Sequence, residues 1–177
     1  MIFGPTPTQI ALSGSWDASP LLSGEFGELL IYGEPQGLRL EMRGSYFGDP
    51  PPEEPPGSTA QLWQFEVLEL FLLGSEQHYL ELEFSPHGHY LALLLHGERN
   101  LCSEGHSLQY QARIQGDEWF AQAQIPSQLL PLGLNAMNFY GIHGQAEERR
   151  YLAWKPPLGD KPDFHRLESF GAIESAG

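Results

Sequence analysis

The sequence is poor in cysteine, in basic residues and in long apolar stretches. Cys102 is the single cysteine in 177 residues, which excludes an internal disulfide and a cluster of thiolate metal ligands. Only nine Lys and Arg accompany 23 Asp and Glu, giving a net charge of −14. Nucleic acids and anionic membranes bind cationic surfaces, so neither is expected as a partner. The apolar run at residues 91–95 is among the longest and is far shorter than a bilayer-spanning helix.

Targeting signals and common catalytic motifs are also missing. Residues 1–7 contain neither a basic segment nor an apolar one, so we expect no secretory signal and a cytoplasmic protein. The sequence has no GxSxG nucleophile elbow, no P-loop and no dinucleotide-binding fingerprint. Cys102, with His106 nearby, could act as a nucleophile. In a polar loop without activating neighbours, the simpler interpretation is an incidental thiol.

The residues that are present suit an all-β fold. Hydrophobic residues make up 41% of the chain and aromatics 12%, which allows a real core, while 20 Gly and 15 Pro supply frequent turns. The length suits a single domain spanning residues 1–177. Most segments alternate polar and apolar residues, and no long segment has the helical period. We therefore predict an antiparallel β-sandwich or barrel of about ten short strands, with at most one or two short helical turns.

The predicted strands are separated by clear turn signals. Strands are expected near residues 9–13, 29–32, 38–42, 65–72, 79–84, 90–95, 108–114, 119–125, 138–142, 151–154 and 170–173. Residues 33–37 and the pair Gly116-Asp117 indicate hairpins. Residues 126–130 could make one helical turn. The Pro-rich segment 49–57 is expected to be an extended loop, because proline has no N–H to give to a sheet.

Two glutamates near the start of the predicted strand 65–72 call for partners. Glu66 and Glu69 are three residues apart and so point to opposite faces of a strand, unless a bulge intervenes. A carboxylate beside core residues needs a partner. We expect an arginine from a later part of the chain, Arg99 or Arg149, to pair with it.

A second acidic pair lies on the next predicted strand. Glu81 and Glu83 share one face with Tyr79, with a separation of roughly 6–7 Å set by the strand rise. Such a pair could serve a glycosidase or a cation site, but a hydrolase needs its two carboxyls placed across the scissile bond. The simpler interpretation is that this face of the strand is exposed to water.

Histidines and tryptophans offer further candidate ligand contacts. The run His87-Gly88-His89 could share a metal ion with His165, but the spacing matches no HExxH-type motif and the set is incomplete. An exposed indole ring can stack on the C–H face of a pyranose, while polar side chains bind the hydroxyls. Each tryptophan alone is more often a core residue. The four are Trp16, Trp63, Trp119 and Trp154.

Two longer stretches carry a resemblance to a known family. The first comprises residues 62–72, 79–88 and 97–100, and the second comprises residues 138–144, 150–154 and 161–168. Together with the loop at residues 49–51 they resemble an uncharacterised family of bacterial and animal proteins, over about residues 45–173. That family is similar to the DOMON-like superfamily and to family-9 carbohydrate-binding modules. The shared features are an acidic strand (Glu66 and Glu69), a strand ending in Pro-x-Gly (Pro86-His87-Gly88), and a closing Trp and Phe-Gly (Trp154, Phe170-Gly171).

The resemblance implies a fold and a type of ligand. It implies a jelly-roll or immunoglobulin-like, DOMON-like β-sandwich that binds a small ligand, often a sugar and sometimes haem, and is not an enzyme. The sugar-binding modules clamp their ligand between paired tryptophans. Haem-binding members use a Met and a His, but Met137 and His143 would lie side by side on one strand, so haem is not expected. A calcium ion is plausible by analogy with the sugar-binding modules, although no EF-hand spacing marks a site.

The expected function is therefore that of a non-catalytic domain binding a carbohydrate or a sugar-containing metabolite, as a monomer or weak homodimer. The expected ligand-binding residues are Trp63, Tyr79, Glu81, Arg99, His143 and Trp154, supported by Glu66, Glu69 and Arg149. No catalytic residue and no metal ligand is assigned. Two alternatives stay open: an enzyme acting on sugar derivatives through Glu81 and Glu83, and a protein-interaction module using an open sheet face or edge.

Overall fold

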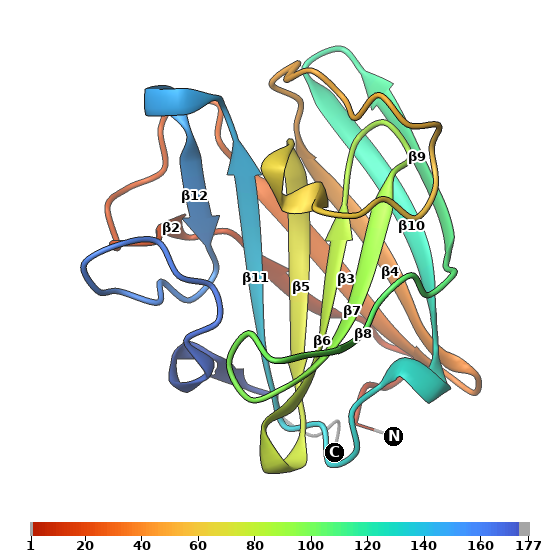
Figure 1. The fold of residues 1–177 in the computed structure, drawn as a ribbon. Coiled ribbons are helices and arrows are strands. Elements are labelled where there is room, and N and C mark those ends of the chain that lie inside the picture. The colour runs from red at the N-terminus through yellow and green to blue at the C-terminus, as the bar shows by residue number, and fades with distance from the viewer. Residues whose placement is uncertain (1, 174–177) are drawn as a thin grey trace.

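The computed structural model describes residues 2–173, which form antiparallel β-strands packed in two layers (Figure 1). The strands are β1 (Thr8–Ala11), β2 (Gly14–Ser15), β3 (Gly27–Glu34), β4 (Gly37–Ser45), β5 (Val67–Leu73), β6 (His78–Phe84), β7 (Tyr90–His96), β8 (Leu101–Ser103), β9 (Gln109–Gln115), β10 (Glu118–Pro126), β11 (Ala136–His143), β12 (Arg150–Ala153) and β13 (Gly171–Ala172). The described helices are 3-10 turns of three residues each: η1 (Leu62–Gln64), η2 (Ser75–Gln77), η3 (Ser127–Leu129), η4 (Ala146–Glu148) and η5 (Leu167–Ser169). None of the helices within residues 2–173 is long and apolar enough to cross a membrane.

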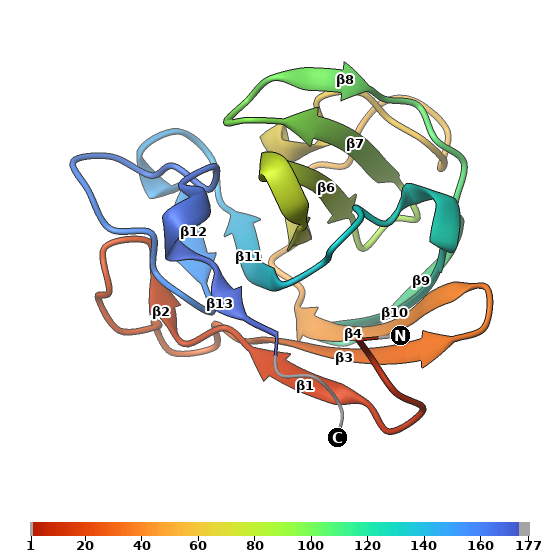
Figure 2. The ribbon, with the colours of Figure 1, turned by 90° about the horizontal axis from the view of Figure 1, so that it is seen from below.

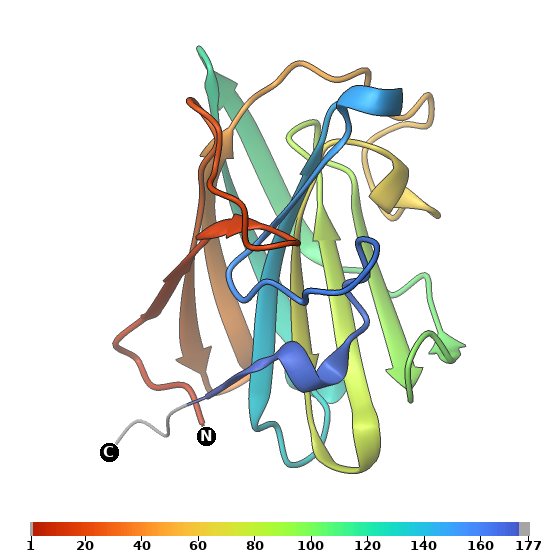
Figure 3. The ribbon, with the colours of Figure 1, turned by 90° about the vertical axis from the view of Figure 1, so that its left-hand side faces the viewer.

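The strands form two sheets of different size. One has the order β1-β3-β4-β10-β9, and the other has the order β2-β12-β11-β5-β6-β7-β8, with β13 paired to β11. Figure 2 shows the larger sheet curving above the flatter, smaller one. Figure 3 shows the two layers from the side. The antiparallel β-sandwich predicted from the alternating sequence is confirmed.

The core lies between the sheets and follows directly from the period of two. On β6, Leu80, Leu82 and Phe84 are buried against the facing sheet, as are Leu38, Leu40 and Met42 on β4. Tyr79, Glu81 and Glu83 point the other way. The outer face of the larger sheet is also buried, because it carries a second apolar cluster. That cluster comprises Leu62, Val67, Phe71, Tyr79, Leu91, Leu93, Leu95, Tyr140, Ile142, Ala153 and Phe164.

Two long connections cover that outer face. Residues 97–107, which include β8, and residues 155–170 both run in front of the larger sheet in Figure 1. Glu81 and Glu83 are consequently only 3% and 0% exposed. The interpretation of their strand face as exposed to water is therefore wrong. Its physical reason is that irregular segments bury the face, and strand periodicity carries no information about them.

Most predicted strands and turns are confirmed within one to three residues. The hairpins at residues 33–37 and at Gly116-Asp117 join β3 to β4 and β9 to β10, and the turn at residues 126–130 contains η3. The segment 49–57 contains no strand, as its prolines require. Two short strands, β2 and β8, were not predicted. Cys102 accordingly lies exposed on the edge strand β8 and not in a loop.

Candidate functional site

A cavity of about 330 Å³ opens on the outer face of the larger sheet. Strands β5, β6, β7, β11 and β12 form its floor and sides, and three connecting segments form its rim. Trp63 comes from η1, Arg99, Leu101 and Glu104 come from the connection 97–107, and residues 162–165 come from the connection 155–170. This volume lies at the low end of the range for small-ligand pockets. The fold thus places a ligand-sized cavity where three loops meet over a sheet.

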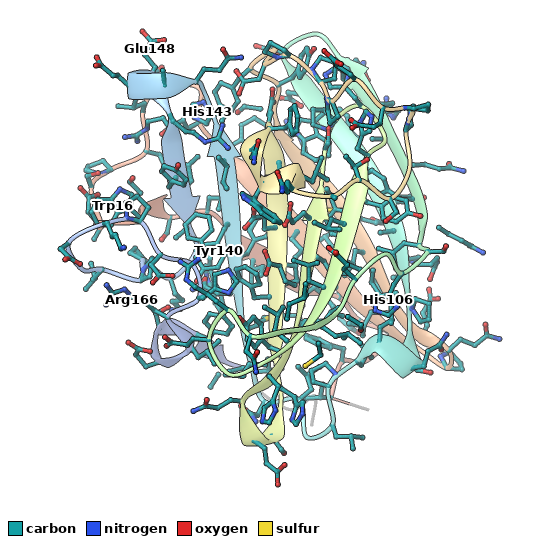
Figure 4. The ribbon with its side chains drawn as sticks, in the orientation of Figure 1. Trp16, His106, Tyr140, His143, Glu148 and Arg166 are labelled. Carbon is teal, nitrogen blue, oxygen red and sulfur yellow. The ribbon has the colours of Figure 1, made fainter. Side chains whose placement is uncertain are left out.

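The cavity wall is mainly apolar and aromatic. Its apolar residues are Trp63, Phe71, Leu93, Leu95, Leu101, Ile142, Tyr151, Pro162 and Phe164. Phe164 is stacked on Tyr140, with ring centroids 3.9 Å apart. Tyr140 lies near the middle of β11, as Figure 4 shows. Trp63 is 40% exposed at the rim, so its indole face is accessible to a ligand.

Two buried glutamates line the floor, and a third adjoins them. Glu69 on β5 lies directly opposite Glu83 on β6, and Glu81 lies two residues before Glu83 on the same strand face. Glu69 and Glu81 line the cavity, and both are at most 3% exposed. Four of their carboxyl oxygens have no hydrogen-bond partner among the described residues: Oε1 of Glu69, Oε2 of Glu81, and both oxygens of Glu83.

Burial dominates the acid–base chemistry of this floor. It raises the pKa of Glu81 to about 7 and the pKa values of Glu69 and Glu83 well above the ordinary value. The negative charge of Glu81 raises the pKa of Glu69 further, and those of Glu69 and Glu81 raise that of Glu83. At neutral pH the floor therefore holds protons that a suitable ligand can displace.

The arginines expected to pair with the acidic strand have other partners. The Arg99 guanidinium donates to Oδ1 of Asp163 at 2.6 Å. The Arg149 guanidinium donates to the backbone carbonyls of Gly144 and Trp63. The predicted pairing of Glu66 or Glu69 with Arg99 or Arg149 is wrong, because both guanidinium groups hold loops in place. Through the Trp63 carbonyl, Arg149 nevertheless supports the rim of the cavity.

His165 belongs to a hydrogen-bonded chain beside the floor. The Tyr79 hydroxyl accepts the backbone N–H of Arg99 at 3.0 Å and lies 2.6 Å from Nδ1 of His165. The Tyr79 hydroxyl therefore donates its proton to Nδ1 of His165, so the proton of the neutral ring is on Nε2. This Nε2 lies 3.8 Å from Oε2 of Glu81, beyond hydrogen-bond distance. Burial lowers the pKa of His165 to about 4, so the ring is neutral at physiological pH.

Glu66 lies on the opposite side of the strand from Glu69, as the spacing predicts. Its carboxylate accepts the backbone N–H groups of Phe47 at 2.9 Å and Asp49 at 3.2 Å. Burial raises its pKa to about 7 even so. Glu66 thus fixes the loop that follows β4 and is absent from the cavity lining.

The structure gathers some of the predicted ligand-binding residues and separates others. Trp63, Glu81 and Arg99 line the cavity together with Glu69, while Tyr79 is buried and does not line it. His143 lies at the end of β11 (Figure 4), where it stacks on Phe47 and contacts Glu25 at 2.9 Å. The Trp154 ring packs against Gly171 and Lys155.

A pair of tryptophans does not meet in this cavity. Trp119 is buried in the core, and Trp16 lies at the flank of the outer cluster (Figure 4). Among the four, Trp63 alone lines the cavity. The other aromatic residues that line the cavity are Phe71, Tyr151 and Phe164, which sequence reasoning missed. Phe164 follows the Lys161-Pro162-Asp163 run, and such an irregular segment gives no periodic signal of the face it covers.

The residues considered for metals have separate partners. His87 lies beside Tyr46, His89 bonds the Glu54 carbonyl at 2.8 Å, and His165 contacts Tyr79. Among residues 2–173, no three His, Cys, Asp or Glu side chains are arranged to hold a metal ion. Met137 and His143 lie at opposite ends of β11 and not side by side, about 20 Å apart by strand rise.

Comparison with known proteins places the chain in a family. No family model matches it. The UPF0462 protein C4orf33 homolog of Danio rerio is 38% identical over 165 residues, covering 88% of this chain and 83% of the relative. The Mus musculus homolog is 39% identical over 144 residues, covering 76% and 75%. The Homo sapiens UPF0462 protein C4orf33 is 33% identical over 165 residues, covering 88% and 82%.

Among solved structures, a candidate carbohydrate-binding protein from Bacteroides uniformis has a similar fold. The TM-score is 0.74 at 14% sequence identity, over 94% of this chain and 85% of the other. At this identity the likeness shows the fold of the β-sandwich and nothing of its ligand. The family is shown by sequence instead: with a third or more of the residues identical over most of each chain, the protein belongs to the UPF0462 family.

Proposed function

We propose that this protein is a non-catalytic binding domain whose ligand is a carbohydrate or a sugar-containing metabolite. The observation that carries the proposal is the cavity of about 330 Å³, which is lined by an exposed indole ring and by two buried glutamates that each carry an unpartnered carboxyl oxygen. A binding site of this kind combines apolar walls with a few placed polar groups. The similar fold of a candidate carbohydrate-binding protein adds support, as does the resemblance to DOMON-like and family-9 carbohydrate-binding modules.

The apolar and the polar parts of the lining match the C–H face and the hydroxyl groups of a pyranose. Trp63 at the rim offers an aromatic face to the C–H groups of the ring. Glu69 and Glu81 at the floor offer oxygens that accept hydrogen bonds from hydroxyl groups. A hydroxyl that reaches these oxygens satisfies acceptors that the protein itself leaves unpaired, which favours binding.

Calorimetric and thermal-shift titration with a panel of neutral and substituted monosaccharides tests the proposal. A ligand at 100 times its Kd adds about 2.7 kcal/mol to stability. For a chain of this size that raises the melting temperature by roughly 5–10 °C. Trp63→Ala is expected to abolish the shift. Leu132→Ala is the matched control, because Leu132 is 87% exposed and does not line the cavity. No shift with any sugar at millimolar concentration contradicts the proposal.

A second candidate function is hydrolysis of a sugar derivative. It is favoured by one observation, the carboxyl of Glu81 in the cavity, whose pKa burial raises to about 7 and so to the value useful for a general acid. Against it, Glu83 does not line the cavity and shares a strand face with Glu81, so the two carboxyls do not flank the space a glycosidic bond would occupy. Turnover of chromogenic glycosides that disappears in Glu81→Gln and in Glu83→Gln supports hydrolysis. Absence of turnover, or turnover that survives both changes, removes these carboxyls from any mechanism.

A further inference from the structure

The cavity floor is acidic and has no counter-ion of its own. Glu69 and Glu81, buried to 98% and 97%, both line the cavity and each carry an unpartnered oxygen, and Glu83 adjoins them with two more. Among the ion pairs of residues 2–173, none joins a lysine or an arginine to these three carboxyls. Buried carboxylates are ordinarily paired with a cation or a metal ion. The counter-ion that these carboxyls lack can therefore be supplied by a ligand.

The cationic groups nearest to the floor do not act as counter-ions, because each has another partner or is uncharged. The guanidinium of Arg99 is held by Asp163, and that of Arg149 is held by two backbone carbonyls. His165 carries no charge, because its pKa is about 4. At the rim, Glu104 and Asp163 add acidic groups, so the lining holds four carboxyls against one arginine.

We infer that the ligand of this cavity carries a protonated primary amine, seated between Glu69 and Glu81, so that the sugar is an amino sugar. The sugar part of this inference rests on the proposed function, and the amine part rests on the floor. An ammonium group has three N–H donors and no acceptor, which complements carboxylate oxygens that only accept. Charge-assisted hydrogen bonds of this kind are about twice as strong as neutral ones.

The walls favour an organic cation over a metal ion. Phe71, Tyr151 and Phe164 line the cavity beside the glutamates, and aromatic faces attract cations. Calcium needs six to eight oxygen ligands. The side chains of Leu93 and Leu95 beside the glutamates offer none, and among residues 2–173 no three His, Cys, Asp or Glu side chains are arranged to hold a metal ion. The same acidity disfavours sugar acids and sugar phosphates, whose charge would be repelled.

Binding of an ammonium group must expel protons from the floor. Groups facing Glu81 are Glu69 from the adjoining strand β5, Glu83 from β6 itself, the Arg99 guanidinium, neutral His165 and the Tyr79 hydroxyl. Burial also raises the pKa values of the two neighbouring carboxyls well above the ordinary value, so an ammonium group seated there replaces protons that these carboxyls hold. Since the pKa of Glu81 is about 7, affinity for an amine that stays protonated rises as the pH increases through about 7, and binding is accompanied by proton release.

The experiment compares three sugars that share one ring. Isothermal titration with glucosamine, glucose and N-acetylglucosamine at equal ionic strength separates the amine from the sugar. Glucosamine is expected to bind at least about tenfold more tightly than the other two. Its binding enthalpy should depend on the ionisation enthalpy of the buffer. Cadaverine and methylammonium serve as amines without a sugar ring, and calcium chloride serves as the metal probe.

Variants localise the effect. Glu69→Gln and Glu81→Gln keep the side-chain volume and are expected to weaken glucosamine binding at least about tenfold more than they weaken glucose binding. Glu28→Gln is the matched control, because Glu28 lies on β3 in the other sheet. Melting temperatures establish that each variant is folded before it is titrated.

Each outcome separates the two proposals. Equal affinity for all three sugars overturns the amine inference and leaves the proposed function supported. Binding of cadaverine or methylammonium without any sugar supports the amine inference and overturns the sugar function. Displacement of glucosamine by calcium at equal charge overturns the preference for an organic cation. A preference for glucosamine that survives in Glu69→Gln and Glu81→Gln overturns the assigned position, and no binding by any probe overturns both proposals.

Discussion

Glu69 and Glu83 face each other across strands β5 and β6, both almost completely buried and neither paired with a lysine or an arginine. Cross-strand neighbours on one face have Cβ atoms about 5 Å apart, so two ionised carboxyls there would repel each other strongly. Burial of these two carboxyls destabilises the fold but gives the apolar cavity a polar floor. It therefore links the stability of this protein to pH and to its ligand.

The first prediction concerns Glu81→Gln and pH. The pKa of Glu81 in the folded state is about 7, against a value of 4.5 for an unburied carboxyl. The folded state thus binds this proton more tightly, and stability is lost as pH rises from about 4.5 to about 7. The loss corresponds to roughly 3 kcal/mol at most. Urea titrations of Glu81→Gln should show its stability relative to the natural chain increasing by up to this amount between about pH 5 and pH 8.

Glu53→Gln provides the control for that pH series. Glu53 is exposed in the Pro-rich segment 49–57, and its replacement should leave the pH dependence of stability unchanged. If the free energies of unfolding of Glu81→Gln and of the natural chain change in parallel from acidic to alkaline pH, Glu81 does not hold the proton that burial assigns to it.

The second prediction concerns an ion-paired glutamate with the opposite sign. Glu25 accepts hydrogen bonds from Arg150 at 2.8 and 3.1 Å, from His143 at 2.9 Å and from the backbone N–H of Leu22 at 2.6 Å. Although burial opposes ionisation, these donors lower the pKa of Glu25 to about 2. Its contribution, on the order of 3 kcal/mol, is present above about pH 4.5 and is lost as pH falls towards 2.

Glu25→Gln should therefore destabilise the protein at neutral pH and lose that effect in acid. Denaturant midpoints measured along a descending pH series check this expectation. Glu28→Gln is the matched control on β3, since its ion pair with Arg43 is exposed and long at 3.8 Å. Exposed pairs contribute roughly 0–1 kcal/mol, so this control should change the midpoint little. Equal effects of the two substitutions would contradict the assigned role of Glu25.

The strands of this fold are predictable from sequence because each carries its own alternating pattern. Leu80, Leu82 and Phe84 show which face of β6 meets the core, and the structure agrees. The short strands β2 and β8 span two and three residues, too few for alternation to be visible. The alternation of polar and apolar residues therefore predicts only those strands that are long enough to repeat it.

The candidate site is only partly predictable for a related reason. The sequence places Glu81 and Glu83 on one strand face, but their burial depends on residues 97–107 and 155–170, which have no repeating pattern. The same limitation explains why the sequence does not show that His143 lies away from the cavity. It ends β11, where its partner Glu25 lies 118 residues earlier in the chain. No local signal connects residues so far apart.

The third prediction concerns a glycine in the β3–β4 turn. Gly37 has φ +143°, and a Cβ atom there would lie 1.9 Å from the Ile125 carbonyl oxygen on β10. Backbone on both sides of this contact is fixed by strand pairing, so Gly37→Ala should separate β4 from β10 locally and cost several kcal/mol. Gly105→Ala is the control, because Gly105 has φ +78° but nothing within 4 Å. It should cost only the backbone strain of about 1 kcal/mol. Urea midpoints that fall equally in both variants would show that strain, and not the clash, determines the effect.

The fourth prediction tests how the cavity rim is held. Arg99 adopts a left-handed backbone conformation with φ 60°, which is unfavourable for a residue with a side chain. Its N–H donates to the Tyr79 hydroxyl, which also bonds His165. Tyr79→Phe leaves both groups without their partner in a partly buried setting, at a cost of about 1–3 kcal/mol.

The loss should be local as well as global, because the hydroxyl joins the two connections that cover the outer face. Hydrogen exchange of the Arg99 amide is expected to accelerate in Tyr79→Phe, with exchange in the segment 161–167 rising alongside it. Tyr32→Phe is the matched control, since its hydroxyl makes only a 3.4 Å contact with Glu41 on the other sheet. If the Arg99 amide exchanges at the same rate in both variants, the left-handed turn is held by the packing of residues 97–107 and not by Tyr79. The acidic floor would then keep its cover without that hydroxyl, and ligand affinity in Tyr79→Phe should match that of the natural chain.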